Sequence, residues 1–80
     1  MDFRGVNVTV VGLGKSGLAV LELLASKGAV LRACDVKPPG ELRGVGEALG
    51  RLGVPFVPQG PAAFQDAHWV VISPGVPADL

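Results

Sequence analysis

A glycine-rich motif at 12–17, with the sequence GLGKSG, has the residue types and spacing of a phosphate-binding turn. It follows a run of β-branched residues and opens an apolar segment with helical spacing. In that context Gly12 permits a tight turn, Gly14 lets backbone approach a phosphate, and Gly17 lets the helix pack closely on the strand. The free N–H groups of the first helical turn, at the positive end of the helix dipole, then face an anion. The motif therefore predicts a nucleotide-binding site.

Two further segments are expected beside this motif. Asp35 lies eighteen residues past Gly17, at the end of a second apolar run, roughly where such folds place a carboxylate near a ribose. The turn 73–77, with the sequence SPGVP, follows another strand-like run. Because ligands of open parallel sheets bind beyond the carboxyl ends of the strands, we expect these three segments to converge on one crevice.

The composition is that of one small globular domain. The 80 residues are 49% hydrophobic and 18% charged, and the glycines and prolines fall between apolar runs. Seven basic and seven acidic residues cancel, which leaves no basic patch for a nucleic-acid partner. With one cysteine, Cys34, and one histidine, we expect a buried unreactive thiol, no internal disulfide and no metal site. We recognise no signal peptide or membrane span, and so expect a cytoplasmic protein with no membrane partner.

Strands and helices must alternate to position these residues. Strands are expected at 6–11, 29–34, 55–58 and 68–73, and helices at 16–27 and 41–52. This pattern predicts an α/β fold, a Rossmann-like parallel sheet of order 3-2-1-4 with helices on both faces. Because a doubly wound sheet normally continues past its fourth strand, we interpret 1–80 as a single, truncated N-terminal domain. Trp69 is expected to pack under the helices, and the apolar edge at 70–72 predicts self-association.

Four segments together resemble the N-terminal domain of the Mur ligases. They are FRGVNVTVV at 3–11, GLGKSGLA at 12–19, CDVKPPG at 34–40 and VISPGVP at 71–77. The resemblance covers nearly all of the chain but only the first of three domains in that family, and it is closest to members that add D-glutamate to UDP-N-acetylmuramoyl-L-alanine. It implies that this domain holds the UDP part of that substrate. It also implies an ATP-dependent ligase of peptidoglycan synthesis, with ATP and Mg²⁺ bound by other domains.

The resemblance further implies a role for each segment of the site. The backbone at Lys15 and Ser16 would meet the diphosphate, residues 35–37 would surround the uridine, and Gly75 would close the other side. Val36 stands where some members have a hydroxyl residue, and Lys37 keeps a positive charge without the planar fork of arginine. No catalytic, cofactor or metal residue is expected on this chain, which alone should be inactive. The full candidate set for the UDP moiety is Gly12, Gly14, Lys15, Ser16, Gly17, Asp35, Val36, Lys37, Ser73, Pro74 and Gly75.

The residues by themselves leave two alternatives open. An NAD(P)-binding Rossmann domain, in an oxidoreductase or a regulatory sensor, accounts for the same glycines and for Asp35. The second alternative is a structural or interaction module, in which the glycine-rich turn at 12–17 binds no ligand. A Walker-type ATP loop is excluded, because its spacing requires glycine at position 9, where this chain has Thr9.

Overall fold

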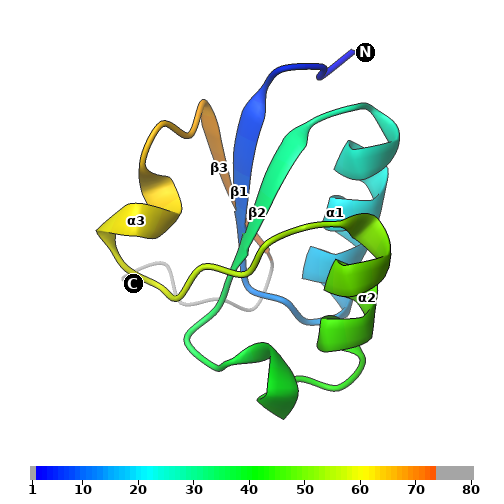
Figure 1. The fold of residues 1–80 in the computed structure, drawn as a ribbon, viewed down its shortest axis with the longest axis vertical. Helices are drawn as coiled ribbons and strands as arrows, with labels where there is room; N and C mark the ends of the chain where they lie inside the picture. The colour runs from blue at the N-terminus through cyan, green and yellow to red at the C-terminus, as the bar shows by residue number, and fades with distance from the viewer. Residues whose placement is uncertain (1, 74–80) are drawn as a thin grey trace.

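The computed structural model describes residues 2–73, and Figure 1 shows how their helices and strands are arranged. Pro74 and Gly75 lie outside the described residues. The elements, in chain order, are β1 (Asn7–Val11), α1 (Lys15–Ser26), β2 (Val30–Cys34), the short 3-10 helix η1 (Pro39–Glu41), α2 (Val45–Leu52), α3 (Pro61–Phe64) and β3 (Trp69–Ile72).

Three parallel strands form the sheet, in the order β2-β1-β3. β1 is central: Val8 lies opposite Leu31 of β2 on one side and opposite Trp69 of β3 on the other. Four consecutive residues of β1, from Val8 to Val11, are buried, as expected of a strand that is covered on both faces. The expected α/β class with a parallel sheet is therefore confirmed.

The expected strand at 55–58 forms only an isolated bridge beside β2, in which Phe56 lies opposite Ala33. The Ala33 N–H donates to the Pro55 carbonyl at 2.9 Å, and the Val57 N–H donates to the Ala33 carbonyl at 2.8 Å. Pro55 has no N–H, so the ladder cannot extend toward the amino end of β2. The described residues hold three strands where four were expected, and the full order 3-2-1-4 is not formed in them.

The helices lie on both faces of the sheet, as Figure 1 shows. On one face, Val10 of β1 packs in a core with Leu21 of α1 and Leu49 of α2. On the other face, Val11 packs with Ala63 of the four-residue helix α3. Successive side chains of a strand point to opposite faces, so one strand contributes to both cores.

The boundaries of two helices differ from those expected. α1 begins at Lys15 with Gly14 as its N-cap, which places Ser16 in the first turn. The expected helix at 41–52 is divided, because Gly44 has a left-handed backbone with φ of 74° and α2 begins only at Val45. Glycine adopts that conformation without steric cost, and a helix cannot continue through it.

The outer strand β3 leaves large apolar side chains exposed. Trp69 is 62% exposed, so the expectation that it packs under the helices is wrong. Val70 and Ile72 are 44% and 52% exposed, and they line a hollow of about 660 Å³ together with Phe64 of α3. Among residues 2–73, the outer side of β3 therefore presents an open apolar surface.

Candidate functional site

The carboxyl ends of the three strands meet at one end of the sheet, here called the carboxyl end. Gly12 follows β1, Asp35 follows β2, and Ser73 follows β3. The Leu13 N–H donates to Oδ2 of Asp35 at 2.9 Å, and Oγ of Ser73 donates to the Gly12 carbonyl at 3.2 Å. The structure thus brings these three segments of the candidate site into direct contact.

The three glycines of the motif differ in what the structure requires of them. Gly12 has φ of 92°, a conformation that other residues rarely adopt. A Cβ atom on Gly17 would lie 1.8 Å from the Gly12 carbonyl oxygen, so any side chain there would displace backbone. A Cβ atom on Gly14 would meet nothing within 4 Å. Gly12 and Gly17 are therefore required by the fold, whereas Gly14 borders open space.

Among residues 2–73, no side chain caps the amino end of α1, and its first residues are exposed. Gly14, the N-cap, makes no side-chain capping hydrogen bond, and the first turn has no acidic residue. The first N–H of the helix with an intrahelical acceptor is that of Leu18, which donates to the Gly14 carbonyl at 2.9 Å. The N–H groups before it point out of the helix end, and both Lys15 and Ser16 are exposed. A helix end of this kind favours anion binding, because its N–H groups can donate to the anion and the helix dipole is positive there.

Asp35 is half-buried, and both of its carboxylate oxygens already accept hydrogen bonds from backbone. Oδ2 accepts from the Leu13 N–H at 2.9 Å, and Oδ1 accepts from the Lys37 N–H at 3.0 Å. Neither contact was foreseen from the sequence, which predicted only a ribose partner for this residue. The side chain of Val36 is 69% exposed and Lys37 is also exposed, so both are accessible beside the strand end.

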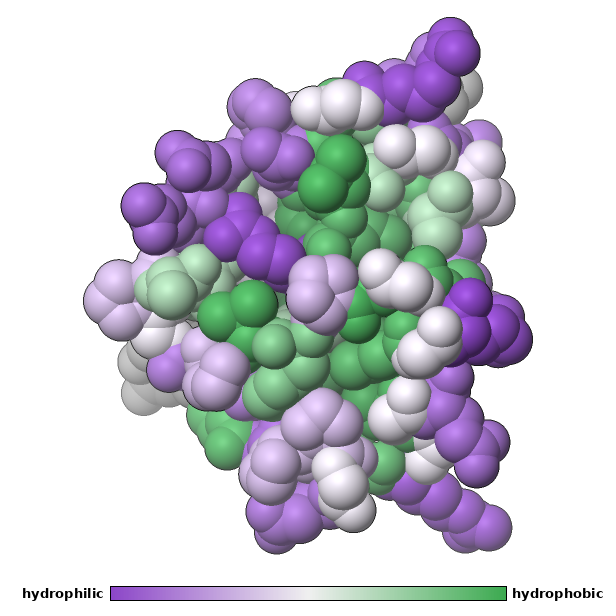
Figure 2. Space-filling view, in the orientation of Figure 1, coloured by the Kyte–Doolittle hydropathy of each residue, from purple (hydrophilic) through white to green (hydrophobic). Residues whose placement is uncertain are grey.

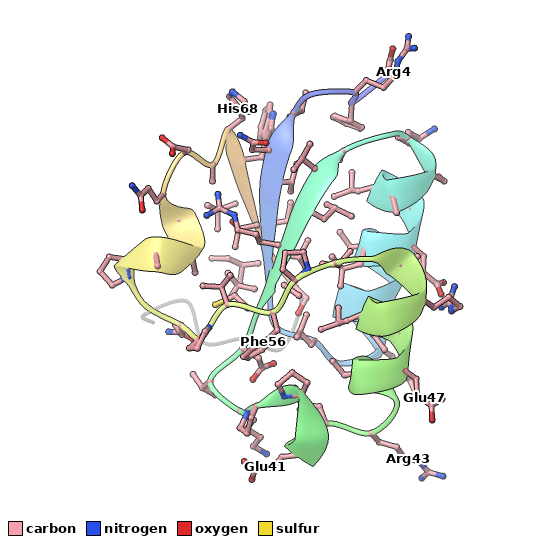
Figure 3. The ribbon with its side chains drawn as sticks, in the orientation of Figure 1. Arg4, Glu41, Arg43, Glu47, Phe56 and His68 are labelled. Carbon is pink, nitrogen blue, oxygen red and sulfur yellow. The ribbon has the colours of Figure 1, made fainter. Side chains whose placement is uncertain are left out.

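A hollow of about 440 Å³ adjoins Asp35 and Val36. Its other walls are Phe56, Pro58 and Gln59, which the candidate set omitted, together with Pro38. Figure 3 shows Phe56 near the carboxyl end of the sheet and His68 at the opposite end. The sequence did hold a signal for these residues, because a segment expected beside the strand at 29–34 must end close to Asp35.

The Ser73 side chain is 5% exposed, and its hydroxyl is engaged with the Gly12 carbonyl. This hydroxyl therefore faces the glycine-rich loop within the protein. The other expected residues of that turn, Pro74 and Gly75, fall outside residues 2–73.

Cys34, the last residue of β2, is fully buried directly before the site. Burial raises the pKa of its thiol above the usual range, and the negative charge of Asp35 raises it further. Both effects disfavour the thiolate, the reactive form. The expectation of a buried thiol is confirmed, and its raised pKa accords with low reactivity.

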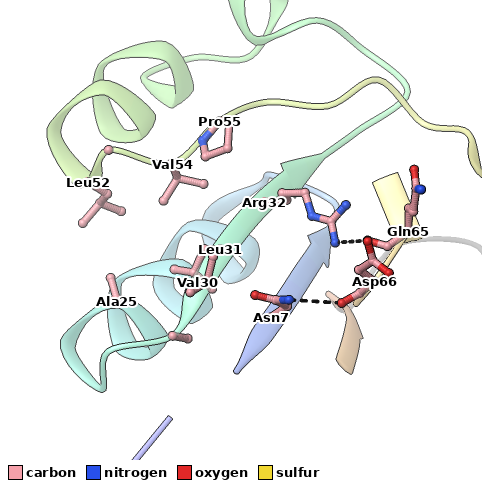
Figure 4. Close-up of a pocket in the computed structure, with 12 residues that line it drawn as sticks. Asn7, Ala25, Val30, Leu31, Arg32, Leu52, Val54, Pro55, Gln65 and Asp66 are labelled. Carbon is pink, nitrogen blue, oxygen red and sulfur yellow. Dashed lines mark hydrogen bonds between the residues drawn. The ribbon is translucent and has the colours of Figure 1, made fainter. Parts of the chain in front are cut away.

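A different hollow, of about 520 Å³, lies at the amino end of the sheet, between β2, the end of α2 and the segment that follows α3 (Figure 4). Figure 2 shows apolar side chains gathered on this face of the molecule. Two polar side chains at its wall, those of Arg32 and Asn7, are engaged within the protein. Arg32 donates to the Ala62 carbonyl at 2.9 Å and to the Gln65 carbonyl. Nδ2 of Asn7 donates to the Asp66 carbonyl at 3.2 Å. None of the expected site residues lines this hollow.

Within residues 2–73, no group of three or more His, Cys, Asp or Glu side chains is placed to hold a metal ion. Over the same stretch, none of the helices has the length and apolar character needed to cross a membrane.

Comparison with known proteins assigns the chain to a family. The family model described as "Mur ligase MurD-like, N-terminal domain" matches residues 6–80. A UDP-N-acetylmuramoylalanine--D-glutamate ligase of Solibacter usitatus is 51% identical over 80 residues, covering 100% of this chain and 17% of the relative. The ligases of the same name from Koribacter versatilis and Clostridioides difficile are 42% and 34% identical, covering 99% and 100% of the chain and 18% of each relative. The chain spans less than a fifth of these relatives, and within that span it belongs to the MurD-like family of Mur ligase N-terminal domains.

Proposed function

We propose that this domain binds the UDP part of UDP-N-acetylmuramoyl-L-alanine at the carboxyl end of its sheet. The observation that carries the proposal is the open, uncapped amino end of α1, in a chain that belongs to the MurD-like family. The diphosphate would accept hydrogen bonds from the backbone N–H groups at Lys15 and Ser16. Gly14 supports this placement, because the space beside it is open.

The uridine would lie beside Asp35 and Val36, in the hollow of about 440 Å³. Phe56 gives that hollow an aromatic wall, which suits a planar base. Lys37 would add positive charge close to the nucleotide, and the turn 73–75 would close the opposite side of the site. The Ser73 hydroxyl already donates to Gly12, so we assign it to holding the glycine-rich loop.

For the longer protein we propose an ATP-dependent ligase that adds D-glutamate to this substrate in the cytoplasm, during peptidoglycan synthesis. The relatives that carry this name support the proposal. ATP and Mg²⁺ would be bound by parts of the protein beyond this domain, which itself would perform no chemical step. Its contribution would be to position the substrate, because binding energy gained at the remote nucleotide can orient the reacting carboxylate.

We also propose that the isolated 80-residue chain self-associates through the outer edge of β3. Trp69, Val70 and Ile72 are all substantially exposed there, and such an apolar edge is a template for pairing with another strand. Sedimentation across a concentration series should reveal dimers that Ile72→Lys suppresses. A monomer at every concentration would contradict this second proposal alone.

The main proposal is tested by measuring the melting temperature with UDP-N-acetylmuramoyl-L-alanine, UDP, NAD or ATP at equal concentration. A ligand that binds only the folded protein raises its melting temperature, and about a hundredfold excess over Kd adds roughly 2.7 kcal/mol. We expect the UDP-sugar to give the largest shift and UDP the next. A larger shift with NAD would overturn the proposal in favour of a dinucleotide-binding domain.

A further inference from the structure

The glycine-rich loop is held by hydrogen bonds from both neighbouring strand ends. On the β2 side, the Gly12 N–H donates to the Cys34 carbonyl and the Leu13 N–H donates to Oδ2 of Asp35, each at 2.9 Å. On the β3 side, Oγ of Ser73 donates to the Gly12 carbonyl at 3.2 Å. Two side chains, each directly after a different strand, thus hold consecutive residues of one loop.

Asp35 differs from Ser73 because it joins two loops. Its second oxygen, Oδ1, accepts the Lys37 N–H at 3.0 Å, so one carboxylate links the glycine-rich loop to the turn after β2. Only an ionised carboxylate offers two acceptor oxygens with no donor between them. Hydrogen bonds from N–H groups to a charged acceptor are also stronger than neutral ones.

We propose that Asp35 is a positioning residue that couples the two halves of the nucleotide site. It holds the loop at 12–14 against the turn at 36–38. The free N–H groups of α1 and the uridine hollow therefore keep a fixed separation. This inference rests on the proposed function, because it assigns the diphosphate to one loop and the uridine to the other. It differs from a direct ribose contact, in which the carboxylate would act on the ligand itself.

The two roles predict opposite rankings of substitutions. Asparagine keeps one acceptor oxygen, so Asp35→Asn should be milder than Asp35→Ala if the side chain only contacts a ribose hydroxyl. In the coupling role, asparagine turns its NH₂ group toward one of the two backbone N–H groups, leaving two donors face to face. Asp35→Asn should then weaken binding at least as much as Asp35→Ala. Charge alone predicts that both variants bind UDP more tightly than the parent, because each removes a negative charge near the diphosphate.

The test uses Asp35→Asn and Asp35→Ala in the full-length protein, with Asp66→Asn as the matched control. Asp66 lies at the amino end of the sheet, where its carbonyl accepts from Asn7, so the control removes the same charge far from the site. NMR hydrogen exchange at Leu13 and Lys37 is measured without ligand, and Kd for UDP is measured by calorimetry. We expect both Asp35 variants to exchange faster at these two amides and to bind UDP about tenfold or more weakly, the cost of about one lost hydrogen bond. The control should match the parent in both measurements.

A clearly milder Asp35→Asn, or unchanged exchange at Leu13 in the alanine variant, would overturn the coupling role. A residue that only stabilised the fold would lower the free energy of unfolding and leave the Kd of the folded protein unchanged, which would also overturn it. Failure of the parent protein to bind UDP would instead overturn the proposed function. The exchange rates need no ligand, and they would still show whether Asp35 ties the two loops.

Discussion

The two ends of the sheet differ less in their polar side chains than in the main-chain donors at the amino end of α1. At the amino end, Arg32 and Asn7 donate to carbonyls of α3 and of the segment that follows it, so their hydrogen-bonding groups are engaged beside a hollow of about 520 Å³. At the carboxyl end, the side chains of Asp35 and Ser73 are likewise engaged, but the first N–H groups of α1 have no intrahelical acceptor. Both ends have a hollow of similar size, so hollow size does not show which end binds a ligand. The main-chain N–H groups at the start of α1 favour the carboxyl end as the place where an anion binds.

The largest expected effect concerns the packing that creates the carboxyl end. A Cβ atom on Gly17 would stand 1.8 Å from the Gly12 carbonyl oxygen, which is a backbone atom and cannot turn away as a flexible side chain would. We expect Gly17→Ala to lower the free energy of unfolding by about 3 kcal/mol or more, the upper range for an overpacked site. Urea denaturation followed by circular dichroism measures it.

The matched control is Gly50→Ala in α2, because a Cβ atom there meets nothing within 4 Å and Gly50 is exposed. That substitution should raise the free energy of unfolding by about 0.5–1 kcal/mol, the usual preference for alanine within a helix. Equal effects at the two glycines would show that the close approach of α1 to the loop is not a constraint.

A second substitution separates binding from stability at the same loop. Gly14 has an extended backbone with φ of −74°, and a Cβ atom there meets no other part of the described protein. We expect Gly14→Val to change the free energy of unfolding by less than about 1 kcal/mol, the range of ordinary surface substitutions. Its side chain would occupy the space assigned to the diphosphate, so the Kd for UDP-N-acetylmuramoyl-L-alanine should rise by about tenfold or more.

Calorimetric titration measures that Kd once circular dichroism has confirmed the fold. If folded Gly14→Val binds as tightly as the parent, the diphosphate does not lie beside this glycine. The difference between the two ends of the sheet would then lose its functional meaning.

Much of this site was predictable from the sequence because local rules determine it. The spacing of Gly12, Gly14 and Gly17 after a β-branched run is sufficient to predict the turn and the close packing of the helix. Parallel strands place their carboxyl ends together, which is why Asp35 and Ser73 were expected beside the loop. These expectations depend on sequence periods of a few residues and on one topological rule.

What the sequence did not reveal depends on tertiary hydrogen bonding. The two acceptor contacts of Asp35 require atomic positions on separate loops, and no spacing encodes them. The short pairing at 55–58 was overestimated, because the missing N–H of Pro55 matters only once its partner on β2 is known. Trp69 was expected under a helix, yet among the described residues no helix covers it sufficiently to bury it.

The smallest expected effect lies at the amino end of the sheet, where a substitution should leave UDP binding unchanged. The Arg32 guanidinium donates to carbonyls at Ala62 and Gln65, which ties α3 to the sheet. We expect Arg32→Ala to lower the free energy of unfolding by about 1 kcal/mol, because these hydrogen bonds are partly exposed and exchange with water. Arg43→Ala, at an exposed position before α2, should stay within about 0.5 kcal/mol of the parent. Arg32→Ala should not change the Kd for UDP, since the Arg32 guanidinium lies at the wall of the hollow at the amino end of the sheet, away from the first turn of α1. If Arg32→Ala weakened UDP binding as strongly as Gly14→Val, the hollow at the amino end would be the nucleotide site, and the free donors of α1 would have been a misleading guide.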